Sequence, residues 1–182
     1  MPVRKKVKDI LIPLSEYAVT NPEKPLREAV RALRKIYCEV EYGKCTEAGH
    51  RTILVLDDSG NLVGILDFKS ILRVLIPEIA GGLTARLEAL GVSIAFAQAD
   101  SANLDEARLG FRARVIKNAE TKVKDAMLKI RGTISADAGL MDALKLIYNN
   151  KITVLPVYEG NKIIGVVRDS DLFLTMAEIL ME

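Results

Sequence analysis

The chain has 182 residues, enough for one domain or two small, closely packed ones, and its 49% hydrophobic and 27% charged residues are typical of a soluble globular protein. A formal net charge of only +2, with one short basic cluster at residues 4–8, does not favour a nucleic-acid-binding protein. No apolar run reaches the roughly 18 residues that a membrane-spanning helix requires, and the charged N-terminus does not resemble a signal peptide, so we expect a cytoplasmic protein without membrane insertion.

The first half of the chain has the pattern of a helix, two strands and a second helix. Apolar periodicity predicts a helix at 26–37, strands at 52–56 and 62–66, and a closing helix at 69–75. The turn Asp57-Asp58-Ser59-Gly60 joins the two strands, which therefore form a hairpin.

Residues 38–49 separate the first helix from the first strand and contain both cysteines, Cys38 and Cys45. The spacing of the cysteines fits neither a CxxC redox motif nor a zinc site, and His50 is the only histidine. We therefore expect a surface excursion with two reduced thiols and no metal site.

The segment 77–120 has no counterpart elsewhere in the chain. Leu83, Leu87 and Leu90 recur with helical spacing, and a charged helical run begins at Leu104. Because a structureless loop of this length is unusual, the segment is predicted to form one or two added helices. Packing at a dimer interface, packing against the rest of the molecule and docking of a partner protein remain open as its role.

The second half repeats the pattern of the first. It contains a predicted helix that begins at Leu140, strands at 153–158 and 162–167, and a closing helix at 172–180. The sequence Asp169-Ser170-Asp171 precedes the closing helix and suits its N-terminal cap.

The two halves align as an internal repeat. Residues 7–11 resemble 123–127 at an offset of 116, whereas 61–66 resemble 162–167 at an offset of 101. The difference places extra residues in the first half, before its first strand. We therefore divide the chain into a first repeat at 1–76, a helical insert at 77–120 and a second repeat at 121–182.

Two motifs in the second repeat point to a known family. Val154-Leu155-Pro156-Val157 places a Pro-Val pair in the first hairpin strand, and Gly165-Val166-Val167-Arg168-Asp169-Ser170-Asp171 runs from the second strand to an Asp at the closing helix. The repeated pattern resembles a tandem pair of cystathionine-β-synthase (CBS) domains, or Bateman module, of the stand-alone bacterial or archaeal type. The resemblance covers roughly residues 5–76 and 121–181. It implies an α/β (α+β) fold in which two repeats pack sheet to sheet about a pseudo-twofold axis and leave two clefts.

The resemblance also implies a function. Related modules bind AMP, ADP, ATP or S-adenosylmethionine in one or both clefts, form homodimers, and regulate a protein target, here unidentified and acted on in trans. The ligand is regulatory, and no cofactor is required. An enzyme is not expected, because the chain has one His and no nucleophile–base motif. The alternative function is a scaffold with empty clefts that dimerises and docks a partner through residues 77–120.

The candidate ligand site lies in the second repeat. Asp171 matches the ribose-binding Asp of the family, although it could also serve only as a helix cap. Lys151 stands where relatives carry a phosphate-binding Arg, but a lysine after Asn149-Asn150 could equally be solvated. The expected walls of the adenine site, which could also be ordinary core, are Ile152, Thr153 and Val154 on one side and Thr133 and Ile134 on the other, and Pro156 is a further ligand-binding candidate.

Other positions depart from the family pattern. Arg168 replaces the usual Thr or Ser, and it could bind a phosphate or fill the space of a ligand. In the first repeat, Asp67 and Ser70 replace the Thr and the Asp, so we expect a degenerate cleft or a different ligand there. Arg51 is a candidate for reaching a phosphate that the other repeat holds.

Overall fold

The computed structural model describes residues 5–37, 51–77 and 110–181, and it has the mixed α/β fold that the sequence predicted. The predicted excursion at 38–49, with Cys38 and Cys45, and most of the insert at 77–120 lie outside the described residues. The elements in chain order are η1 (Val7–Asp9), β1 (Ile12–Pro13), η2 (Leu14–Glu16), β2 (Val19–Thr20), α1 (Leu26–Tyr37), β3 (Thr52–Leu56), β4 (Leu62–Asp67), α2 (Phe68–Leu75), α6 (Phe111–Asn118), α7 (Val123–Ala126), β5 (Ile134–Ser135), α8 (Leu140–Asn150), β6 (Val154–Glu159), β7 (Lys162–Arg168) and α9 (Asp169–Met181).

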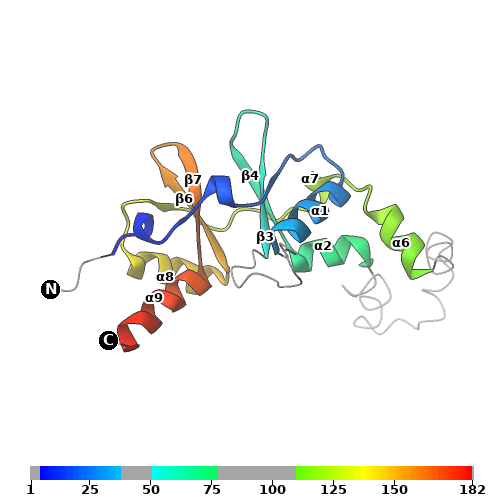
Figure 1. The fold of residues 1–182 in the computed structure, drawn as a ribbon. Helices are drawn as coiled ribbons and strands as arrows, with labels where there is room; N and C mark the ends of the chain where they lie inside the picture. Colours follow the sequence, from blue (N-terminus) through cyan, green and yellow to red (C-terminus); the bar gives the residue numbers. More distant parts are fainter. Residues whose placement is uncertain (1–4, 38–50, 78–109, 182) are drawn as a thin grey trace, which may run out of the picture.

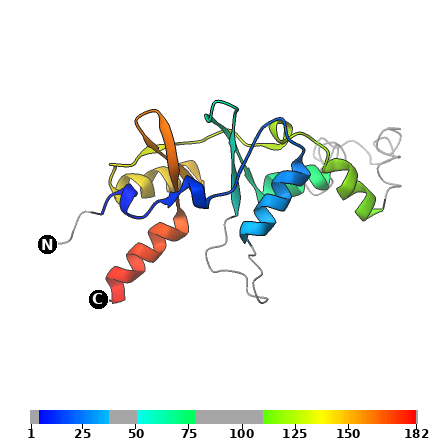
Figure 2. The same ribbon diagram turned by 45° about the horizontal axis from the view of Figure 1, so that its top comes forward.

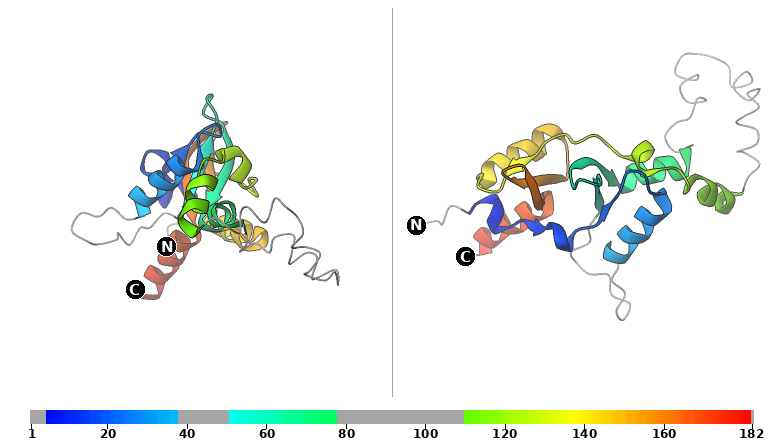
Figure 3. Two further views of the ribbon diagram at one scale, coloured as in Figure 1. Left: turned by 90° about the vertical axis from the view of Figure 1, so that its right-hand side faces the viewer. Right: turned by 90° about the horizontal axis from the view of Figure 1, so that it is seen from above.

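The strands form two small sheets with the same internal plan. One has the order β2-β3-β4 and the other β1-β7-β6-β5. In each, a helix connects two parallel strands, and an antiparallel hairpin follows. The hairpins β3–β4 and β6–β7 stand side by side (Figure 1), and α1 and α8 lie on opposite sides of this row (Figures 2 and 3). This arrangement is that of two repeats related by an approximate twofold axis.

The leading segment of each repeat packs on the opposite repeat. Strand β1 pairs antiparallel with β7. In the same way, Leu128 pairs with Ile65 of β4 through two backbone hydrogen bonds of 3.0 and 2.8 Å. Val7 is fully buried in the core of the second repeat, and Val123 is fully buried in the core of the first. The similarity at an offset of 116 residues therefore marks two segments that exchange places.

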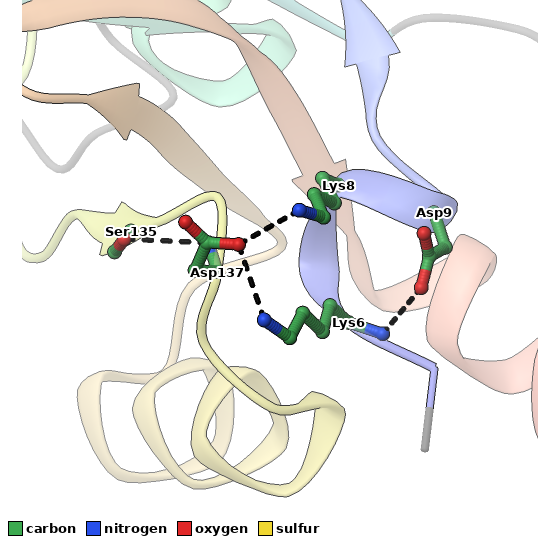
Figure 4. Close-up of polar contacts among 5 residues, drawn as sticks. All are labelled: Lys6, Lys8, Asp9, Ser135 and Asp137. Atoms are coloured by element: carbon green, nitrogen blue, oxygen red, sulfur yellow. Dashed lines mark hydrogen bonds and ion pairs between the residues drawn. The ribbon is translucent and has the colours of Figure 1, made fainter. Parts of the chain in front are cut away.

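A symmetric pair of salt-bridge clusters holds these exchanged segments. The Nζ atoms of Lys6 and Lys8 lie 3.2 and 2.8 Å from Asp137 Oδ1, and the backbone N–H of Lys6 donates to Asp9 (Figure 4). At the equivalent place, Lys122 and Lys124 lie 2.7 and 2.8 Å from the two carboxylate oxygens of Glu23. The hydrogen bonds from Lys122 and Lys124 lower the pKa of Glu23 to about 2, and that from Lys8 lowers the pKa of Asp137. Because these side chains are exposed, the clusters fix register more than they add stability.

A third core cluster lies between the two sheets. It contains Tyr17 and Leu54 from the first repeat and Val154, Ile163 and Val166 from the second, each at most 7% exposed. Leu54, which aligns with Pro156 of the second repeat, is fully buried there. The start of α2 lies beside the beginning of β6 at one margin of this interface, where residues of both line one cavity.

Candidate functional site

A cavity of about 280 Å³ opens at the margin between the two repeats. The first repeat contributes residues from β3, β4 and α2, and the second contributes the connector before β5 and the beginning of β6. The lining residues are Thr52, Ile65, Asp67, Lys69, Arg73, Leu128, Lys129, Arg131, Gly132, Lys151, Ile152, Thr153 and Val154.

The floor of the cavity is mainly apolar. Val154 and Thr52 are buried, whereas Ile65, Leu128 and Ile152 are half-buried. The Thr52 hydroxyl hydrogen-bonds to the hydroxyl of Tyr17, so the polar atom of Thr52 is satisfied within the protein. A slot of this kind suits a flat, largely apolar ring.

The rim of the cavity is cationic. It is formed by five exposed side chains, Lys69, Arg73, Lys129, Arg131 and Lys151. None of the five makes an ion pair with another residue in the described part of the chain. Free cations at the mouth of an apolar slot suit a ligand with phosphate groups.

Lys151 has an unusual backbone conformation. Its φ is 51°, the left-handed region, which no other non-glycine residue in the described ranges adopts. The residue ends α8, and its N–H donates to the carbonyl oxygen of Tyr148 at 3.3 Å. Glycine or asparagine usually occupies such a position, so the choice of lysine costs stability and places a cation on the rim.

Asp67 is the carboxylate of this cavity. Its Oδ1 accepts the backbone N–H of Ser70 at 2.6 Å, and the Ser70 hydroxyl accepts the N–H of Asp67 at 3.0 Å, so the two residues form a reciprocal cap of α2. Ser70 is 2% exposed, and its hydroxyl also donates to the carbonyl of Asp67. Oδ2 of Asp67 has no hydrogen-bond partner among the described residues and can accept from a ligand.

The equivalent positions of the second repeat carry an internal ion pair. Arg168 Nη2 lies 2.6 Å from Asp171 Oδ1, and its Nε lies 3.0 Å from Oδ2. The two side chains are only 13% and 12% exposed. The hydrogen bond to Asp171 raises the pKa of Arg168, whereas burial raises the pKa of the neighbouring Tyr17 to about 12. Asp171 also accepts the backbone N–H of Arg168 at 2.9 Å, as the Ser70 hydroxyl accepts that of Asp67 at the start of α2.

The structure divides the residues that the sequence grouped together. Lys151, Ile152, Thr153 and Val154 line the cavity, but the helix start that meets them is that of α2, with Asp67. Arg168 and Asp171 lie at the start of α9, beside Tyr17 of the opposite repeat. Each helix start therefore faces residues of the other repeat, which sequence periodicity alone does not reveal.

The remaining predicted residues lie elsewhere. Thr133 and Ile134 line a separate, open hollow of about 590 Å³ with Tyr158 and Asn161. Pro156 is buried in β6 opposite Val166. The guanidinium of Arg51 lies over the ring of Phe68, 5.5 Å from its centroid.

The sequence did not predict four of the rim cations: Lys69, Arg73, Lys129 and Arg131. Lys69 and Arg73 are four residues apart and so share one face of α2, a spacing that could have drawn attention to them. Lys129 and Arg131 belong to no motif, and only the fold brings them to the cavity.

Within the described residues, no three His, Cys, Asp or Glu side chains come together in a way that could hold a metal ion. Among the described helices, none has the length and apolar character needed to cross a membrane.

Comparisons with known proteins agree with this architecture. The family model described as "CBS domain" matches residues 7–77 and 123–178. No curated protein sequence matches the chain. The crystal structure of CBSX2 in complex with AMP is similar with a TM-score of 0.59 and 19% identity, over 96% of this chain and 97% of that one.

Two further solved structures show the same fold. An uncharacterized conserved protein from Pyrococcus horikoshii has a TM-score of 0.58 and 17% identity, over 97% of this chain and 95% of its own. A putative acetoin utilization protein (AcuB) from Vibrio cholerae has a TM-score of 0.60 and 17% identity, over 98% of this chain and 94% of its own.

Proposed function

Because the chain belongs to the CBS domain family and contains two copies of the domain, we propose that it is a regulatory module whose ligand is an adenosine nucleotide bound in the cavity between the repeats. The observation that carries this proposal is the apolar floor beneath a cationic rim. The floor suits the adenine ring, and the rim suits the phosphates. The similar fold of CBSX2, whose structure was determined with AMP, supports the same class of ligand.

A carboxylate for the ribose diol can come from either helix start. Asp67 lines the cavity, and one of its carboxylate oxygens has no hydrogen-bond partner among the described residues. Asp171 occupies the family position but is paired with Arg168. Asp67 is therefore the ribose-binding residue in this proposal, and Asp171 remains the family-based candidate that the experiment must test against it.

The module acts on a separate protein in this proposal, without catalysis of its own. A homodimer is part of it, because α9 exposes the apolar side chains Phe173, Leu174, Ile179 and Leu180, each at least 57% exposed. Light scattering at micromolar concentration would give the mass of a dimer, and Phe173→Glu with Ile179→Glu would give that of a monomer. A monomeric mass for the wild-type chain would contradict the dimer.

The experiment that tests the ligand is a thermal-shift series with AMP, ADP, ATP and S-adenosylmethionine. A ligand at 100 times its Kd should stabilise the fold by about 2.7 kcal/mol, a rise of several degrees for a domain of this size. The matched variants are Asp67→Asn and Asp171→Asn, each compared with its own melting temperature without ligand. Loss of the shift only in Asp67→Asn supports the cavity beside α2, whereas loss only in Asp171→Asn places the ribose beside α9. No shift with any adenosine compound in the wild-type chain would contradict the proposal and favour the scaffold function.

A further inference from the structure

We propose that the cationic rim makes this cavity selective for the number of phosphates, so that it binds an adenosine triphosphate more tightly than a monophosphate. This inference rests on the proposed nucleotide site and adds its specificity. The AMP complex of CBSX2 alone would suggest a monophosphate as the ligand. The preference for a triphosphate rests instead on the cationic rim of this chain.

The first argument is the balance of charge. Five basic side chains and one carboxylate line the cavity, an excess of four positive charges. A nucleoside monophosphate brings about −1.5 to −2 charges at neutral pH, since the second pKa of a phosphate is about 6. Such a ligand leaves much of the positive charge uncompensated, whereas each further phosphate removes more of it.

The second argument is that the rim cations have no partners among the described residues. Elsewhere in the described ranges, four exposed lysines are paired with acidic side chains, Lys6 and Lys8 with Asp137 and Lys122 and Lys124 with Glu23, whereas others, such as Lys145 and Lys162, stand singly and not in a cluster. The five rim cations instead repel one another across one cavity. A bound polyanion relieves this repulsion, and its electrostatic attraction to the rim grows with the number of negative charges that it carries.

The third argument is the spread of the cations around the mouth. Lys69 and Arg73 lie one turn apart on α2, Lys129 and Arg131 belong to the connector before β5, and Lys151 ends α8. Because the cations come from three separate elements of the fold, a chain of phosphates can contact more of them than a single phosphate can.

Calorimetric titration of the full chain with adenosine, AMP, ADP, ATP and inorganic tripolyphosphate tests the inference. The buffer contains EDTA, because Mg²⁺ would neutralise part of the phosphate charge. At 50 mM salt we expect the affinity to rise from AMP through ADP to ATP, with ATP at least tenfold tighter than AMP. The ratio should shrink at 500 mM salt, since screening weakens interactions between exposed charges.

Matched double variants assign the selectivity to the rim. Lys129→Gln with Arg131→Gln should lower the affinity for ATP at least tenfold and that for AMP by a smaller factor. Lys145→Gln with Lys162→Gln removes the same charge from exposed positions away from the cavity and should leave both affinities unchanged. If both double variants weaken ATP equally, the effect comes from net charge and the inference is wrong.

The outcomes separate this inference from the proposed function. AMP binding as tightly as ATP would overturn the selectivity and leave the nucleotide site standing. Tripolyphosphate binding as tightly as ATP would support the anionic rim but contradict recognition of an adenosine ligand. Failure of every nucleotide to bind would overturn both.

Discussion

The two repeats form the same hydrogen bond at the start of their closing helices, but with different side chains around it. After each hairpin, the closing helix begins with a side chain that accepts a backbone N–H three residues earlier: Ser70 accepts from Asp67, and Asp171 accepts from Arg168. In the second repeat the two side chains also neutralise each other and are nearly buried. In the first, the carboxylate of Asp67 faces a cavity with a cationic rim. The fold therefore preserves this hydrogen bond in both repeats, whereas the side-chain charges differ: Asp67 lines the cavity, and Asp171 is paired with Arg168.

The largest expected difference between the repeats lies at their equivalent glycines. A Cβ on Gly165 would overlap the carbonyl oxygen of Ile12, a backbone atom of the paired strand β1. A Cβ on Gly64 would lie 2.5 Å from the sulfur of Met127, a flexible side chain that can move. We expect Gly165→Ala to cost about 3 kcal/mol or more and Gly64→Ala about 1 kcal/mol. Urea unfolding measures the loss of stability in both variants. Equal losses would show that the pairing of β1 with β7 tolerates an added Cβ as well as the pairing of Leu128 with β4 does.

The next difference concerns the two helix starts. Asp171→Ala leaves the guanidinium of Arg168 without its carboxylate in a nearly buried place and should cost about 2–3 kcal/mol. Asp67→Ala removes only one side of a half-buried reciprocal cap, leaves no unpaired charge and should cost about 1 kcal/mol. The control is Arg168→Met with Asp171→Asn, which leaves no unpaired charge and should lose less than Asp171→Ala alone. A double variant that loses more would mean that the pair itself stabilises the fold strongly.

Tyr17 lies between the cavity beside α2 and the ion pair at the start of α9, and its burial makes the stability of the fold depend on pH. Its hydroxyl bonds to Thr52 of the cavity, and burial raises its pKa to about 12, whereas an unfolded tyrosine titrates near 10. Between these values the unfolded state binds fewer protons than the folded state, so the free energy of unfolding falls as the pH rises from 10 to 12. We expect the wild-type chain to lose about 2 kcal/mol more than Tyr17→Phe over this range, measured by urea unfolding at each pH. Parallel curves for the two proteins would contradict the raised pKa.

The sequence predicts the elements of both repeats well, because each depends on local periodicity. The helix expected at 26–37 has those bounds, although the closing helices begin earlier than expected, at Phe68 and Asp169. The similarity of 7–11 to 123–127 also identified the leading segments. It could not show that each crosses to the other repeat, since the apolar pattern of a short segment does not specify its partner.

The residues that line the cavity were harder to predict than the helices and strands, because a local sequence pattern does not show which repeat a segment packs on. Lys151 and Asp171 are close in sequence and belong to one repeat, yet only Lys151 lines the cavity. Lys129 and Arg131 reach it from an irregular connector that carries no motif. A cleft between exchanged segments combines residues that sequence analysis assigns to different repeats.

The smallest expected effect on stability separates the backbone role of Lys151 from the role of its charge. Lys151 lies at the C-terminal end of α8 and lines the cavity together with residues of α2. Lys151→Gly removes the cost of a left-handed non-glycine residue but adds the backbone entropy of glycine, so stability should change by less than about 1 kcal/mol. The affinity for ATP should nevertheless fall several-fold, because one rim cation is lost. Thermal unfolding and calorimetric titration of Lys151→Gly and Lys151→Asn, which also tolerates this conformation, measure the two effects separately. Unchanged affinity in both variants would remove Lys151 from the phosphate-binding rim and leave selectivity to α2 and the connector, whereas a clear loss would show that the end of α8 also holds the phosphates.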